Sequence, residues 1–262
     1  FGADVISFYK TSNDPIQVAA FDKMLEEVNK GVALWTIFGH SSAYFVDFEI
    51  GLVENYSNRD RYPMMIVLGC YAGSCSGNLK GLGEQFLLSP QRGAIAYTGT
   101  TSAGYISDLN AYASHFYDLT GSGAYGETIG ELMRRNIASL YKNAGAGMAG
   151  VLHQGLLQGD PALRLYPHPG PDYLTDDRSV RVQPVPANTG SSTIHIAFDV
   201  LNIGRHDGGK VEIRIEQRLP DGKVLLRLTD SVTAGPYRTS LRYDVPCDNT
   251  PVGFSRFLIT VD

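Results

Sequence analysis

The sequence predicts an α/β domain followed by a small all-β domain. Three observations carry this prediction. Short apolar runs first alternate with helical patterns, a proline-rich run at 167–171 then interrupts both, and afterwards apolar residues recur at every second position. A proline-rich run can neither continue a helix nor lie inside a sheet. We therefore place the linker between the two domains at 167–171, with domains at residues 1–170 and 171–262.

The first domain is expected to contain a mostly parallel sheet with helices on both faces. Its apolar runs do not alternate with polar residues, which is typical of strands covered on both sides. The predicted strands are residues 4–9, 33–38, 64–68 and 94–97, and the predicted helices are residues 16–29 and 128–142.

The last domain is expected to be an antiparallel sandwich. Its runs alternate apolar with polar residues, as strands with one buried face do, and turn signals such as Asn202-Ile-Gly and Pro220-Asp-Gly separate several of them. The predicted strands are residues 193–201, 210–217, 223–229, 237–243 and 255–261.

Composition argues against two classes of function. Lys and Arg total 22 against 27 Asp and Glu, the formal net charge is −5, and no basic residues cluster in a run. Nucleic-acid binding needs a basic stripe, so we expect no nucleic-acid partner. The most apolar stretches, residues 31–38 and 64–69, are far shorter than the ~20 residues that cross a bilayer, so we expect no membrane span.

The cysteines argue against a disulfide scaffold or a metal site. Cys70, Cys75 and Cys247 are an odd number, so at least one is unpaired within the chain. Cys70 and Cys75 lack a second ligand pair for zinc, and no Asp/Asn-rich loop has the calcium-binding pattern. We therefore expect no metal and no cofactor, and a regulatory disulfide between Cys70 and Cys75 is kept as an alternative.

Reactive side chains follow two consecutive predicted strands. The strand at 33–38 runs into Gly39-His40-Ser41-Ser42, and the strand at 64–68 runs into Gly69-Cys70-Tyr71. If these strands are parallel neighbours, His40 and Cys70 lie side by side at the carboxyl rim of the sheet, where the reacting groups of open sheets collect.

A thiol beside an imidazole is a nucleophile beside its base. A neighbouring imidazolium favours the thiolate, which is the attacking form. The backbone N–H of Cys70 and one from the turn at Ser41 would bind a developing oxyanion, and Gly69 would let a substrate backbone approach closely. The plainer interpretation makes Cys70 a small buried apolar residue and His40 a solvated turn residue. Their position after neighbouring strands favours catalysis.

An esterase is the main rival enzyme. Gly39-His-Ser-Ser-Ala is close to the Gly-x-Ser-x-Gly elbow of α/β-hydrolases, with Ser41 as the nucleophile. That elbow must lead at once into a helix, whereas residues 44–50 alternate like an extended segment.

Residues 30–167 resemble the gingipain-like cysteine peptidases, a family of the caspase-like clan. The resemblance lies in the motifs around His40 and Cys70 and in three later segments. These are residues 93–101 with Gly104-Tyr105, residues 126–131, and residues 159–165, the last similar to the family's terminal strand. It implies hydrolysis of peptide bonds through a thioester, with Cys70 as nucleophile and His40 as general acid and base.

The resemblance also implies further features. Thr100, Thr101 and Tyr105 would line the substrate pocket, and the last domain would be immunoglobulin-like. The family includes the sortase of the type IX secretion system, which makes transpeptidation an alternative and secretion-system components alternative partners. Either activity implies peptide or protein substrates and a location outside the cytoplasm, extracellular or at the outer surface of a bacterial cell.

Two departures from the family pattern allow a third interpretation, an inactive binding or assembly module with the same fold. Family members often carry Gly directly after the histidine, where this chain has Ser41. The carboxylate that orients the family's histidine usually lies upstream, and Asp47 and Glu49 are the acidic candidates nearby.

The resemblance finally implies an incomplete sheet. The clan's sheet begins with a central strand, and residues 4–9 look like its second strand, so the first strand is expected to be missing. The strand at 33–38 would then carry unpaired backbone groups along one edge, which is costly. We therefore expect an upstream segment or a partner chain to complete the sheet.

Overall fold

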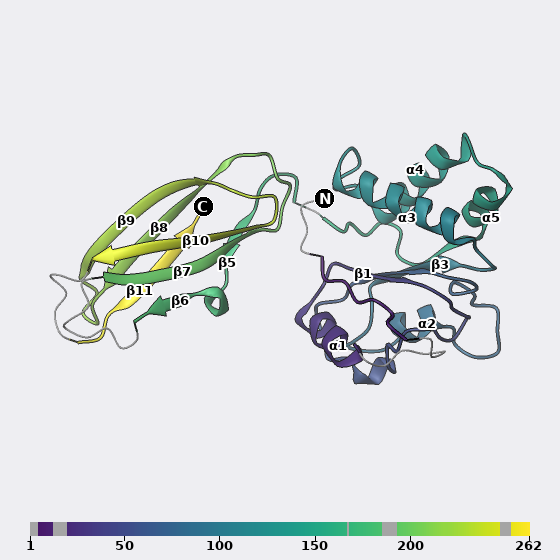
Figure 1. Ribbon diagram of the computed structural model, residues 1–262, viewed down its shortest axis with the longest axis horizontal. Helices are drawn as coiled ribbons and strands as arrows, with labels where there is room; N and C mark the ends of the chain where they lie inside the picture. Colours follow the sequence, from purple (N-terminus) through teal and green to yellow (C-terminus); the bar gives the residue numbers. More distant parts are fainter. Residues whose placement is uncertain (1–4, 13–19, 167, 185–192, 247–252) are drawn as a thin grey trace. The chain divides into compact units, whose positions relative to one another are not determined.

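The computed structural model describes residues 5–12, 20–166, 168–184, 193–246 and 253–262. They form two compact units, a first one of residues 6–165 and a second one that holds Val5 and residues 166–262 (Figure 1). Each unit is described by itself below.

The first unit is a mixed sheet between two layers of helices. The strand order is β1-β2-β3-β4, in which the first three strands run parallel and β4 is antiparallel to β3. Helices α1 and α2 cover one face of the sheet, and α3, α4 and α5 cover the other (Figure 1). The elements are β1 (Leu34–Phe38), β2 (Met64–Leu68), β3 (Ala96–Thr100), β4 (Gly155–Gly159), α1 (Phe21–Lys30), α2 (Leu82–Leu87), α3 (Ile106–Gly121), α4 (Ile129–Tyr141), α5 (Ala146–Gln154) and the 3-10 helix η1 (Val53–Asn55). This arrangement confirms the predicted fold class.

Alternate strand residues supply the two cores. Met65 and Val67 of β2 pack with α1 and α2, while Met64, Ile66 and Leu68 pack with α3, α4 and α5. Every residue of β2 is therefore buried, which explains why this run shows no polar alternation. The central position of β2 fixes where the loop after it leaves the sheet.

Two predicted strands are wrong. The apolar run at 4–9 forms no strand over its described residues, and the side chain of Val5 is 78% exposed. The last strand of the sheet is β4, and the chain turns after it, so residues 159–165 are not the terminal strand. Residues 161–163 instead accept hydrogen bonds from the first N–H groups of α4, Gly130 N to Pro161 O at 2.9 Å and Ile129 N to Leu163 O at 2.8 Å. Those carbonyls therefore satisfy a helix start rather than a strand partner.

The helices differ from the prediction in number and in bounds. α1 begins at Phe21, and residues 16–19 of the predicted helix lie outside the described residues. α4 matches the predicted helix at 128–142, with Thr128 as its N-cap residue. Helices α2 and α3 are additional to the prediction.

The second unit contains two antiparallel sheets that enclose one core. One sheet has the order β10-β7-β5 with β6 also paired to β7, and the other has the order β11-β8-β9. Ile196, Ile213 and Val245 lie fully buried in this core. The strands are β5 (Tyr173–Thr175), β6 (Arg181–Gln183), β7 (Thr193–Asn202), β8 (Lys210–Arg218), β9 (Val224–Thr233), β10 (Arg238–Pro246) and β11 (Arg256–Val261), with a 3-10 helix η2 (Asp177–Ser179). The predicted antiparallel sandwich is confirmed, and Cys247 lies outside the described residues.

One edge of the first sheet is open within the described chain. β1 pairs with β2 along one side, and no described strand pairs with its other side. Thr36 and Phe38 of this strand are exposed. That an upstream segment or a partner chain covers this edge stays a prediction.

None of the described helices is long and apolar enough to cross a membrane.

The first turn of α4 gives a prediction about acid stability. Glu131 accepts hydrogen bonds from Arg134 Nε at 2.7 Å and from Arg135 Nε at 2.9 Å. These bonds, that of Arg134 first, lower the pKa of Glu131 from 4.5 to about 2. A lowered carboxyl pKa stabilises the fold above the unfolded-state value, and this contribution disappears as the pH falls through the folded-state value.

We expect Glu131→Gln to reduce the loss of stability between about pH 5 and about pH 3, because the variant has no charge to lose there. Urea unfolding at both pH values measures the change. Glu54→Gln, on an exposed residue of the same unit, is the control. An equal acid loss in the wild type and in Glu131→Gln would contradict the assignment.

Candidate active site

His40 and Cys70 leave the first sheet at the same level from neighbouring strands. The parallel register pairs Phe38 of β1 with Leu68 of β2, and Gly39 N donates to Leu68 O at 3.2 Å, which continues the ladder. Each of the two reactive residues lies two positions beyond this pair. Because paired strands lie ~4.8 Å apart, the two backbones are close where His40 and Cys70 begin.

The Cys70 side chain lies toward the loop that leads into α3. Leu68 belongs to the core on the α3 side, and Cys70 follows it by two residues, which keeps the same side in an extended chain. Its Sγ atom is 3.9 Å from Gly104 O. Cys70 is partly buried, whereas His40 is exposed. Cys70 is thus partly covered at the edge of the core, while His40 is accessible to solvent.

Ser41 ties the segment after His40 to the Cys70 backbone. Its hydroxyl donates to Cys70 O at 2.8 Å. Ser41 also forms an antiparallel bridge with Val46, and Asp47 N donates to His40 O at 2.9 Å, so the chain makes a short hairpin here. Ser41 leads into this hairpin and not directly into a helix, which excludes the elbow geometry of an esterase. The Ser41 hydroxyl is therefore a tether between the two loops.

Gly69 is required by this tether. A Cβ atom at Gly69 would lie 2.1 Å from Ser41 Oγ and 2.6 Å from Gly39 O. The close approach at Gly69 is thus made by the protein's own hairpin, whereas the sequence suggested an approach by the substrate. Nothing local in the sequence signals this contact, because its partners lie 28 or more positions away.

The loop after Cys70 runs along the end of β3. Tyr71 has a left-handed backbone conformation with φ +60°, which residues other than Gly rarely adopt. Its N–H donates to Ser102 O at 2.9 Å. Gly73 N donates to Thr100 O at 2.8 Å, and a Cβ at Gly73 would lie 2.4 Å from Gly99 O. The strained turn at Tyr71 is held in place by these bonds on the β3 side.

The three residues predicted for the substrate pocket lie in different environments. Thr100 is 4% exposed, and its hydroxyl lies 2.5 Å from Gly69 O and 3.0 Å from Ser102 O. One hydroxyl hydrogen serves one of these acceptors at a time, so Thr100 holds the loop carbonyls in place. Thr101 is exposed, and Tyr105 is 72% exposed.

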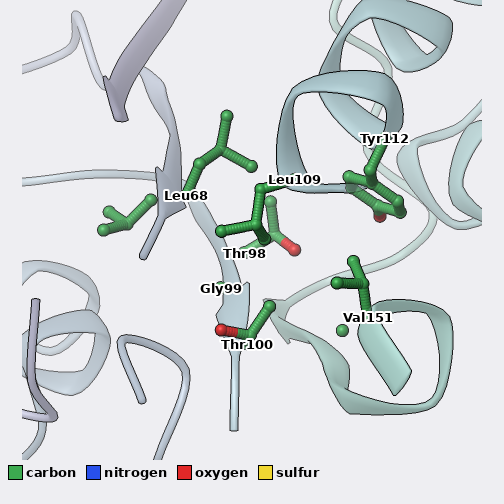
Figure 2. Close-up of a pocket in the computed structure, with 9 residues that line it drawn as sticks. Leu68, Thr98, Gly99, Thr100, Leu109, Tyr112 and Val151 are labelled. Carbon is green, nitrogen blue, oxygen red and sulfur yellow. The ribbon is translucent and has the colours of Figure 1, made fainter. Parts of the chain in front are cut away.

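A small cavity lies behind this rim, on the α3 side of the sheet. Figure 2 shows Leu68, Thr98, Thr100, Leu109, Tyr112 and Val151 around it. Its volume of about 10 Å³ is close to the room needed by one water molecule. A substrate side chain therefore has to bind outside it.

The acidic candidates near His40 have other partners. Asp47 Oδ2 lies 3.2 Å from Lys10 Nζ, and a Cβ at Gly39 would lie 2.4 Å from Asp47 Oδ1. Glu49 Oε1 accepts a hydrogen bond from Gly51 N at 2.5 Å. The structure thus gives each carboxylate a contact other than the imidazole.

The cysteines within the described ranges are free. Cys70 is partly buried and Cys75 is exposed, and they form no disulfide with each other. Over the same ranges, no group of three His, Cys, Asp or Glu side chains has the proximity needed to hold a metal ion.

Comparison with known proteins gives a family and a fold. The model of Peptidase family C25 matches residues 4–166, which is more than half of the chain. No curated protein matches the sequence.

Solved structures share the architecture. A complex of Porphyromonas gingivalis RgpB pro- and mature domains has a TM-score of 0.52 at 15% identity over 92% of this chain and 53% of that chain. The Arg specific cysteine proteinase gingipain R (RGPB) has a TM-score of 0.51 at 15% identity, over 92% and 52%. A third structure, of a protease, has a TM-score of 0.50 at 12% identity, over 87% and 57%. The chain spans about half the length of these structures, and at these identities the likeness establishes the fold.

The tether gives a prediction about stability. We expect Gly69→Ala to lower the free energy of unfolding by about 1–3 kcal/mol, because the added methyl group meets Ser41 Oγ and Gly39 O. We expect Ser41→Ala to cost about 1 kcal/mol through the lost bond to Cys70 O. Urea unfolding of both variants provides the measurement.

The double variant distinguishes a local clash from a general weakening. Removal of the Ser41 hydroxyl relieves the closest contact, so the cost of Ser41→Ala with Gly69→Ala should be less than the sum of the single costs. Strict additivity, or a Gly69→Ala variant as stable as the wild type, is incompatible with the contact described.

Proposed function

Because this chain belongs to peptidase family C25, we propose that it cleaves peptide bonds with Cys70 as the nucleophile and His40 as the general acid and base. The parallel register of β1 with β2 carries this proposal, since it brings both residues to one rim at one level. The bond from Ser41 to Cys70 O, which joins the two loops, supports it further.

The chemistry proceeds in two balanced halves. The Cys70 thiolate attacks the scissile carbonyl carbon, and the oxyanion accepts hydrogen bonds from the Cys70 N–H and from an N–H of the turn at Ser41. The tetrahedral intermediate collapses, the C–N bond breaks, and the His40 imidazolium protonates the leaving amine. The acyl group then remains on sulfur as a thioester. His40 next takes a proton from water, the water oxygen attacks the thioester carbon, and the free acid leaves with the thiolate restored.

The same thioester serves hydrolysis and transfer. Attack by an amine in place of water would form a new amide, which is the sortase-like alternative. From the family relation we infer peptide or protein substrates and action outside the cytoplasm, extracellular or at the cell surface. Secretion-system components would be partners in the transfer reaction. Mass analysis of products formed with and without an added amine distinguishes hydrolysis from transfer.

Replacement of the dyad tests the proposal. We expect Cys70→Ala to abolish turnover of a fluorogenic peptide library and His40→Ala to lower kcat by about 10²–10⁴-fold, because general acid–base catalysis contributes that much. Cys75→Ala, which removes the other described thiol, should retain activity.

Thermal unfolding of each variant confirms that the fold is intact. Turnover that survives in folded Cys70→Ala rules out the thioester route. A folded wild type that cleaves no peptide and yields no acyl-enzyme with peptide thioesters supports the inactive binding module instead.

A further inference from the structure

A second hollow of the first unit lies beside the hairpin that follows His40. Its volume is about 470 Å³, within the range of small-ligand sites, and aromatic side chains from two segments line it. Phe21 comes from the start of α1, and Tyr44, Phe45 and Phe48 come from the hairpin and the segment after it. Tyr44 is 42% exposed and Phe45 is 57% exposed. We name this hollow the Glu49 pocket, after the acidic residue among its lining residues.

Among the lining residues that the structure describes, Glu49 is the one with a charged side chain. Its Oε1 atom accepts a hydrogen bond from Gly51 N at 2.5 Å. Throughout the described ranges no cation pairs with this carboxylate. Burial and then the charge of Glu49 raise the pKa of Tyr56, so the carboxylate acts on the adjacent core. A carboxylate among aromatic groups with no cation beside it attracts one.

The Phe21 wall of the pocket is held in place by the protein itself. Gly51 has φ +67°, and a Cβ there would lie 2.6 Å from Phe21 Cζ, so the Phe21 ring rests against the Gly51 backbone. Asn55 Oδ1 accepts a hydrogen bond from Leu52 N at 2.9 Å. Aromatic faces carry partial negative charge and bind ammonium or guanidinium groups, and a fixed cage loses little entropy on binding.

The Glu49 pocket is linked to both loops of the candidate active site. Leu82 N donates to Ala43 O at 2.7 Å, and a Cβ at Gly77 would lie 2.5 Å from Tyr44 Oη, which joins the hairpin to the chain after Cys70. The pocket lies against α1 and α2, whereas Cys70 Sγ lies toward Gly104 and α3. The Glu49 pocket is therefore remote from the bond that Cys70 would cleave.

We propose that the Glu49 pocket binds an arginine or lysine side chain of the peptide substrate, remote from the cleaved bond, with the cation on the aromatic faces and its charge against Glu49. That the bound side chain belongs to a substrate rests on the proposed peptidase function. The binding step itself does not depend on catalysis.

Titration with matched amino-acid probes tests the proposal without turnover. N-acetyl-arginine methylamide and its uncharged analogue N-acetyl-citrulline methylamide are titrated into the Cys70→Ala chain, and the Gly51 amide signal is followed by NMR. We expect the arginine probe to bind about tenfold more tightly than the citrulline probe, the ratio that a cation on an aromatic cage gives. Glu49→Gln should remove this ratio, and Glu54→Gln, a neighbouring exposed carboxylate outside the pocket, should preserve it.

Phe45→Leu provides a second test should Glu49→Gln fail to fold. It keeps an apolar side chain but removes an aromatic face, so it should weaken the arginine probe several-fold and leave the citrulline probe nearly unchanged. Equal affinity of the two probes for the folded wild-type pocket, or no shift at Gly51, overturns the proposal.

A kinetic comparison links the pocket to catalysis. It measures kcat/KM for two peptides that carry either arginine or citrulline at a position away from the cleaved bond. If the wild type cleaves neither peptide while the probes still bind selectively, the proposed function fails and the pocket remains a cation site. If the peptides are cleaved with equal kcat/KM, the pocket plays no part in substrate choice.

Discussion

The parallel pairing of β1 with β2 is the constraint on which the candidate site depends. Both strands are short, and β2 is buried along its whole length, so a shift in register would move Met64, Ile66 and Leu68 out of the core they share with α3, α4 and α5. That register places the residues after Phe38 beside those after Leu68. The apolar core therefore fixes the relative position of His40 and Cys70 without any direct bond between them.

Close backbone contacts at two glycines then hold the two loops together. Gly69 lets the Ser41 hydroxyl reach Cys70 O, and Gly73 lets the chain after Cys70 lie against Gly99 at the end of β3. A side chain at either glycine would separate loops that have to stay in contact. The buried hydroxyl of Thr100 serves the same end, since it is bonded to the loop carbonyls and not directed to solvent. Small residues and short hydroxyls thus hold the loops of the candidate site together.

Much of this fold could be predicted from composition along the chain, and much of the site could not. The strand at 64–68 is evident because a strand covered on both faces is apolar throughout, and the strand at 34–38 is apolar at every position except Thr36. The end of β3 is not evident from the sequence, since Thr98, Gly99 and Thr100 are buried although none of them is a large apolar residue. α3 carries a readable helical pattern at Leu109, Tyr112, Ala113 and Phe116, whereas the glycines of α5 conceal a helix that tertiary packing stabilises.

Features that need a distant partner could not be predicted from a local pattern. The strand predicted at residues 4–9 is wrong because a strand needs a partner strand, which the apolar run does not supply. The tether from Ser41 and the convergence of Phe21 with Phe45 depend likewise on distant segments.

The central claim is that the Cys70 thiol and the imidazole of His40 act as a pair. Iodoacetamide alkylation near neutral pH tests it most directly, because Cys75 in the same chain is a free and exposed internal reference. Mass analysis of the two cysteine peptides gives the ratio of their alkylation rates. The account predicts that His40→Ala lowers the Cys70 rate about tenfold or more relative to Cys75, since the imidazole no longer promotes the thiolate. An unchanged ratio in a folded variant would contradict it.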